Sequence, residues 1–177
     1  MQRQDRANAN FYLRLAAIGV LTYLIHEAAH WVTGQALGYP VQFGINGVTS
    51  TVPMTASDHI SFSLAGPCVT ILGAVAAYFW IRREHSLTAY AVLYFSFFMR
   101  LVATVVSLFN PNDEARASQL LGLGVWTIPA LVVLGLGALT FAASRKMLLS
   151  WKVNLGAYFV SSVVIAAIVG LDMALRP

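Results

Sequence analysis

The sequence predicts an all-α integral membrane protein with about five transmembrane helices and a short β-hairpin between the first two. Of its 177 residues, 58% are hydrophobic and only 10% are charged, whereas a soluble domain usually carries about 25% charged residues. The mean hydropathy is +0.70, so lipid is the expected surroundings for most of the chain. The length predicts a single polytopic domain over residues 1–177, with no room for an appended soluble module.

Each of the five apolar segments has close to the roughly 20 residues that cross the hydrocarbon core of a bilayer. We expect each to be helical, because only a helix satisfies its own backbone groups in lipid. Arg3 and Arg6 precede the first segment as in a signal peptide, but no small-residue cleavage site follows, so we expect a retained span. The segments cover residues 11–37, 60–81, 87–109, 120–143 and 149–175.

The fourth apolar segment contains helix-disrupting residues. Pro129 predicts a kink there, and four glycines would allow close packing against another helix of the same chain or of a partner. The oligomeric state stays open. These glycines are Gly122, Gly124, Gly135 and Gly137.

The connection between the first two segments, residues 39–53, carries no charge. Asn46-Gly47 lies there between β-prone flanks, which is a strong hairpin signal. Such a hairpin could be an ordinary connection, or its strand edge could bind an extended peptide. The sequence favours neither use over the other.

The net charge of +4 is small and its basic residues form no run, so nucleic acid is not an expected partner. The basic residues divide unevenly in a five-span topology, which predicts a cytoplasmic N-terminus and an external C-terminus. Arg100 lies in the middle of the third segment, where it could reach toward water, pair structurally or serve a site. The single cysteine, Cys68, excludes an internal disulfide. The larger basic group is Arg3, Arg6, Arg14, Arg82, Arg83, Arg145, Lys146 and Lys152, and the smaller one is Arg116 and Arg176.

The first segment contains His-Glu-Ala-Ala-His at residues 26–30. His26 and His30 are four residues apart on a helix, so both rings can reach one metal ion, and neutral imidazoles are good zinc ligands. Glu27 is close enough to act as a general base toward a metal-bound water. Because polar groups are costly within an apolar span, we interpret this cluster as a binding site for one zinc ion.

A catalytic zinc ion needs a third protein ligand. His59 and His85 are expected at the membrane interface, so the acidic residues after the third segment are better candidates. Asp113 is our first choice and Glu114 the second. The topology brings residues 26–30, the second segment near Gly66 and the acidic group to the same side of the membrane.

In their order, these motifs resemble the site-2 protease family of intramembrane zinc metalloproteases, here as a small member without a PDZ domain. The motifs are the His-Glu-Ala-Ala-His helix, Ser63-Leu64-Ala65-Gly66-Pro67 on the next span, and Asn110-Pro111-Asn112-Asp113 after the third. The resemblance covers about residues 11–135. It implies a three-helix catalytic core in that range, with an additional helix at residues 149–175.

The resemblance implies that His26, His30 and Asp113 bind zinc and that Glu27 activates water to cut a transmembrane or membrane-proximal peptide bond. It also implies that Asn110 or Asn112 contacts the substrate. The expected substrate is a membrane-embedded protein, held further by Gly66 and by the hairpin around Asn46 and Gly47. The expected location is the plasma (inner) membrane of a prokaryote. In the family the catalytic centre faces the cytoplasm, whereas the charge distribution places it outside, so the orientation stays open.

Three other functions remain open from the sequence. One is a non-proteolytic membrane scaffold or regulator with the same fold, in which zinc is structural or absent. The second is a carrier or channel lined by Arg100 and the histidines. The third is a different membrane zinc hydrolase, acting on a lipid or a prenylated peptide, with Glu114 as the third ligand.

Overall fold

Six helices and one hairpin make up the part of the chain that the structure, a computed structural model, describes, which is residues 8–175. Five of the helices are long and apolar enough to cross a membrane, which confirms the predicted number of apolar helices of that length. They are α1 (Ala9–Ala36), α2 (Ala56–Arg83), α3 (Leu87–Val106), α5 (Thr127–Lys146) and α6 (Trp151–Leu175).

The predicted hairpin lies between α1 and α2 and consists of β1 (Val41–Gly44) and β2 (Gly47–Ser50) in antiparallel pairing. Its turn residues are Ile45 and Asn46, one position earlier than the Asn46-Gly47 signal suggests. Neither turn residue has a positive φ, and the φ of +147° falls on Gly47 at the start of β2. Glycine tolerates this backbone conformation without steric cost, so the signal is real but acts at the strand rather than inside the turn.

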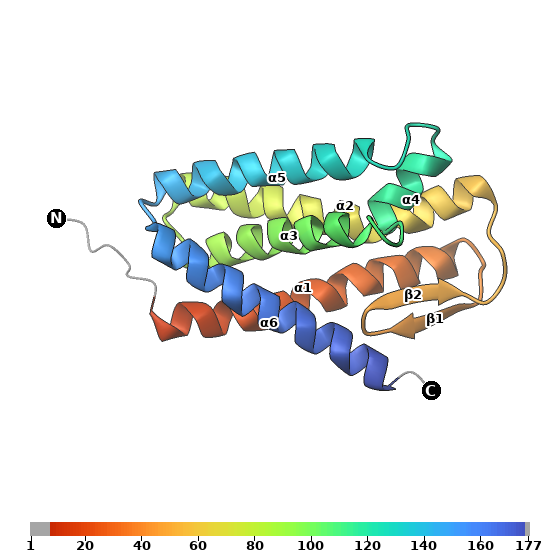
Figure 1. The fold of residues 1–177 in the computed structure, drawn as a ribbon, viewed down its shortest axis with the longest axis horizontal. Helices are drawn as coiled ribbons and strands as arrows, with labels where there is room; N and C mark the ends of the chain where they lie inside the picture. The colour runs from red at the N-terminus through yellow and green to blue at the C-terminus, as the bar shows by residue number, and fades with distance from the viewer. Residues whose placement is uncertain (1–7, 176–177) are drawn as a thin grey trace.

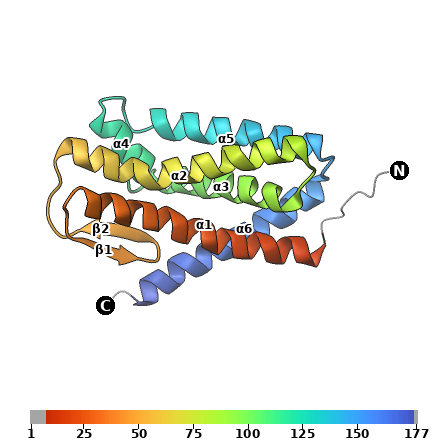
Figure 2. The ribbon, with the colours of Figure 1, turned by 180° about the vertical axis from the view of Figure 1, so that it is seen from behind.

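The helices α1, α2 and α3 pack against one another, and α5 and α6 pack on this group from different sides. In Figures 1 and 2, α1, α2, α3 and α5 run along the long axis of the molecule, and α6 crosses α1 and α3 obliquely. The hairpin and the short helix α4 (Asp113–Leu120) lie at the same end of the bundle, and the hairpin is beside the C-terminal end of α6 (Figure 1).

The prediction of one helix over residues 120–143 is wrong at its N-terminal end. The polar helix α4 ends at Leu120, a turn follows, and α5 begins only at Thr127. Gly122 and Gly124 have φ values of +72° and +78°, so they form this turn instead of packing between helices. Pro129 lies in the first turn of α5, where it removes no intrahelical hydrogen bond, and so the expected mid-helix kink has no cause there.

The most buried helix is α3, whose large side chains Tyr90, Leu93 and Phe95 are fully enclosed by the other helices. In contrast, α5 and α6 expose large apolar side chains such as Leu134 and Phe159. An apolar exterior around a packed interior is consistent with a multi-pass membrane protein, since water would disfavour such a surface.

Most of the described basic residues that begin or end a helix lie at one end of the bundle. Arg82 and Arg83 end α2, Arg145 and Lys146 end α5, and Lys152 begins α6, all at the end away from α4. Three arginines in the prediction, Arg3, Arg6 and Arg176, lie outside the described residues.

Candidate metal centre

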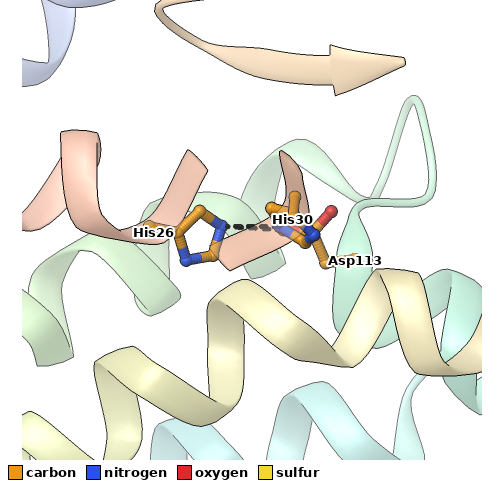
Figure 3. A group of neighbouring side chains, drawn as sticks. All are labelled: His26, His30 and Asp113. Carbon is orange, nitrogen blue, oxygen red and sulfur yellow. Dashed lines mark hydrogen bonds and ion pairs between the residues drawn. The ribbon is translucent and has the colours of Figure 1, made fainter. Parts of the chain in front are cut away.

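Two histidines of α1 and the first residue of α4 form a close cluster of three possible ligand atoms. Nε2 of His26 lies 3.1 Å from Nε2 of His30 and 3.1 Å from Oδ2 of Asp113. Nε2 of His30 lies 3.4 Å from the same carboxylate oxygen. Figure 3 shows the three side chains pointing toward one another between the hairpin and α2.

The helix α1 presents the histidines to the interior because they continue its buried face. Phe11, Leu15, Gly19 and Tyr23 precede them at intervals of four residues, so one side of α1 is enclosed along its length. His26 and His30 are 2% and 3% exposed. Burial of polar rings on a helix face that is otherwise apolar requires specific partners for each nitrogen.

The hydrogen-bond partners of Nδ1 in His26 and His30 determine the tautomer of each ring. The Thr70 hydroxyl donates to the carbonyl of Gly66 at 3.0 Å, so it accepts from Nδ1 of His26 at 3.1 Å. Nδ1 of His30 lies 2.7 Å from the carbonyl oxygen of Phe62, which can only accept. Both neutral rings therefore hold their proton on Nδ1 and direct an Nε2 lone pair into the cluster.

This arrangement fits a metal ion. Two Nε2 lone pairs and a carboxylate oxygen face one another without a proton between them, and a cation at their centre would remove that repulsion. A tetrahedral zinc site with bonds of about 2.0–2.1 Å separates its ligand atoms by about 3.3 Å, close to the 3.1 to 3.4 Å separations here. Hydrogen bonds from Nδ1 to protein oxygens are also typical of zinc-binding histidines.

The start of α4 places Asp113. Pro111 precedes it, Asn112 caps the helix, and the Asn112 side chain accepts a hydrogen bond from the backbone N–H of Asp113 at 3.1 Å. The N–H of Asn112 itself donates to the hydroxyl of the buried Ser107 at the end of α3. These bonds connect the end of α3 to the first residue of α4, so the Asp113 carboxylate is directed by a capped helix end.

The neighbouring carboxylate, Glu114, points elsewhere. Its Oε1 accepts a hydrogen bond from Nη1 of Arg100 at 3.0 Å, and both side chains are buried. The same Nη1 lies 3.8 Å from Oδ2 of Asp113. Of the two candidates for the third ligand, the structure brings Asp113 to the histidines and pairs Glu114 with Arg100 of α3.

Gly66 lies directly against the two imidazole rings. A Cβ atom at this position would come 2.4 Å from Nε2 of His30 and 2.6 Å from Nε2 of His26. Such distances cannot be accommodated without displacing both rings. Glycine is therefore required here so that α2 can approach the face of α1 that carries the cluster.

Glu27 lies between the two histidines in sequence and is 5% exposed. Its Oε2 is enclosed and has no hydrogen-bond partner among the described residues. A carboxylate oxygen buried without a hydrogen bond to the protein is costly, so Glu27 is an unusual residue for the buried face of an apolar helix. Glu27 lines the same cavity as the cluster, so its side chain borders the space in which a small polar molecule could bind.

A cavity of about 540 Å³ opens beside the cluster. It collects the residues that the sequence analysis assigned to the substrate: Asn46 and Gly47 from the hairpin, and Asn110 and Asn112 from the turn before α4. The Asn112 side chain already serves as a cap, whereas Asn110 is exposed at the cavity, so Asn110 has the more accessible amide. Gly66 is not among the residues that line the cavity; it lies against the Nε2 edges of the two rings.

Two residues at this site were missed from the sequence. Thr70 could have been found, because it lies one helical turn after Gly66 and so shares its face of α2. The second is Asp172 in α6, which lines the cavity; a carboxylate in an apolar segment is in itself a reason to expect a function. The two remaining histidines, His59 at the start of α2 and His85 after its end, take no part in the cluster.

No family model matches the chain, and no match was found among curated proteins or solved structures.

Proposed function

We propose that this protein is an intramembrane zinc metalloprotease that cleaves a transmembrane or membrane-proximal peptide bond. The observation that carries this proposal is the convergence of two Nε2 atoms and one carboxylate oxygen within 3.4 Å, at a cavity that Glu27 also lines. The order of the motifs, which resembles that of the site-2 protease family, supports the same reaction. So do the five helices long and apolar enough to span a bilayer.

His26, His30 and Asp113 would hold one zinc ion and leave one coordination position for water or substrate. Zinc in such a site supplies a Lewis acid that polarises a carbonyl and lowers the pKa of water. The ring protons on Nδ1 keep both histidines oriented through Thr70 and the Phe62 carbonyl. Arg100, with its charge 3.8 Å from Asp113, offsets part of the negative charge that the two acidic residues bring to the site.

Glu27 has the role of general base. Its carboxylate accepts a proton from the attacking water and returns that proton to the leaving amine, as the reaction requires. Burial of Glu27 in the cavity wall keeps bulk water away from the carboxylate. A site that only stabilises the fold would have no need of such a base, which favours the protease over a non-proteolytic scaffold.

The hairpin is suited to hold the substrate. Within the described chain, β2 pairs with β1 on one edge and with no strand on the other, while Gly47, Val48 and Thr49 of β2 line the cavity. A transmembrane helix shields its own peptide bonds, so a substrate must unwind before cleavage. An unwound segment could add to the free edge of β2 through main-chain hydrogen bonds.

A reconstituted system tests this function. The purified protein is placed in liposomes with single-span peptides whose apolar segment is interrupted by glycine or proline, and cleavage is followed by mass spectrometry. We expect cleavage within or next to the span that stops when a chelator removes zinc and resumes when zinc is added. Cleavage that persists without zinc, or no cleavage by the zinc-loaded protein, would contradict the proposal.

A further inference from the structure

The turn of the hairpin is hydrogen-bonded to α6 through the carboxylate of Asp172. Oδ1 of Asp172 accepts hydrogen bonds from the backbone N–H of Ile45 at 3.1 Å and from that of Asn46 at 3.2 Å. Two successive N–H groups directed at one anionic oxygen form a compact, charge-assisted contact. The Asp172 side chain is 5% exposed, so this contact is shielded from solvent.

The other end of the hairpin is fastened separately. Next to β1, the Tyr39 hydroxyl donates to Oδ2 of Asp58 at 2.8 Å, and the N–H of Thr51 donates to the carbonyl of Pro40 at 3.0 Å. The Val41 side chain packs so closely on α1 that a Cβ at Gly34 would meet it at 2.6 Å. The hairpin is thus held at its base by α1 and α2 and at its turn by α6.

These contacts at the base and at the turn of the hairpin hold β2 beside the cavity. β2 and the part of α6 around Val169 and Asp172 line the same cavity as Glu27 and His26. In Figure 1 the C-terminal end of α6 lies beside the hairpin, far along the bundle from the start of α6. The distance between the edge of β2 and the cluster therefore depends on where α6 holds the turn.

We infer that Asp172 is a positioning residue, which holds the turn of the hairpin so that a strand added to β2 lies beside Glu27. This inference rests on the proposed function. It predicts that Asp172 acts through hydrogen-bond acceptance and contributes to substrate binding without taking part in the chemical step. The sequence separation of 126 to 127 residues between the partners makes the contact a tie between distant parts of the chain.

The test compares Asp172→Ala with Asp172→Asn in the full-length protein in liposomes. Alanine removes the acceptor, whereas the side-chain carbonyl oxygen of asparagine can still receive both N–H groups. For the alanine variant we expect a KM at least about tenfold higher, the factor that one hydrogen bond to a charged group represents. We expect kcat to stay within about twofold, because the chemical step is unaffected. The asparagine variant, whose neutral oxygen still accepts both N–H groups, should show a smaller rise in KM than the alanine variant.

Amide hydrogen exchange gives a readout that does not depend on cleavage. In the alanine variant, the amides of Ile45 and Asn46 should exchange at least about tenfold faster, while the amides of α3 around Phe95 keep their protection. If α3 also loses protection, that variant is unfolded. In that case Ile45→Pro is measured instead. This variant removes the backbone N–H of Ile45 that donates to Asp172, and it should also raise KM.

Two results would overturn the inference. One is a parental KM in a folded variant that lacks the acceptor. The other is an equal rise of KM in Asp172→Ala and Asp172→Asn, which would assign the effect to the charge. Failure of the proposed function has a different signature, since the parent protein would then cleave none of the peptides. In that case faster exchange of the Ile45 and Asn46 amides still supports the anchor, and unchanged exchange refutes it.

Discussion

Nη1 of Arg100 lies 3.0 Å from Oε1 of Glu114, and the two buried side chains connect the middle of the bundle to α4. Removing Glu114 leaves the buried Arg100 with only its longer contact, at 3.8 Å, to the Asp113 carboxylate. We therefore expect Glu114→Ala to lower the free energy of unfolding by about 3–5 kcal/mol. The measurement is denaturant unfolding in detergent. The exposed Glu84, changed to alanine, is the control and should have little effect; equal losses in both variants would contradict this role.

The choice between the two acidic residues of α4 as zinc ligand can be decided with isosteric amides. Asp113→Asn removes an anionic oxygen from the cluster, so zinc affinity should fall by more than about 100-fold, since even outer partners of zinc ligands contribute about 10–100-fold. Glu114→Gln should weaken zinc binding by less than Asp113→Asn, because its carboxylate faces Arg100. Zinc affinity is measured by competition with a chelating dye. The reverse order would make Glu114 the ligand.

Thr70 is expected to act on zinc through His26. Thr70→Val removes the acceptor of the Nδ1 proton, so the ring loses its orientation and zinc affinity should fall by about 10–100-fold. The matched control is Thr140→Val in α5, because the Thr140 hydroxyl also donates to the carbonyl four residues before it, whereas the hydroxyl that contacts His26 is that of Thr70. A similar loss of affinity in both variants would point to a general effect on the fold.

The contact between Gly66 and the imidazole rings gives a steric prediction. Gly66→Ala places a methyl group at 2.4 Å from Nε2 of His30, so zinc binding and cleavage should both be lost. In the same helix, a Cβ at Gly73 meets nothing within 4 Å, and Gly73→Ala should be neutral or stabilise the helix by up to about 1 kcal/mol. Zinc content and thermal stability of the two purified variants check this prediction. Parental zinc content in Gly66→Ala would contradict the geometry.

The long helices could be predicted because each depends on local composition. An apolar run of about 20 residues defines a span regardless of what surrounds it, and α1 and α3 begin within two residues of their predicted starts. The helix α4 was missed because only its N-terminal Asn112-Asp113-Glu114 signal was visible, and the apolar run after it concealed the turn at Gly122 and Gly124. Conformations set by positive φ values in single residues leave little trace in hydropathy.

The site was predictable to the extent that helical spacing and topology determine it. The interval between His26 and His30 places both rings on one face, and the direction of α3 brings Asp113 to the same end of the bundle. The pairing of Glu114 with Arg100 and the tie from Asp172 to the hairpin depend on how distant segments pack. No local pattern encodes a contact across 126 residues, so these partners required the three-dimensional structure.

The central claim is that Glu27 is the base of a zinc-dependent peptide hydrolysis, and its most direct test is Glu27→Gln in the liposome assay. Glutamine keeps the shape of the side chain but accepts no proton, and it is not one of the three clustered ligands. We predict that cleavage of the single-span peptides falls by at least about 100-fold, the smallest usual contribution of a general base, while the variant retains one zinc ion per chain. Cleavage at the parental rate by the zinc-loaded variant would contradict the claim.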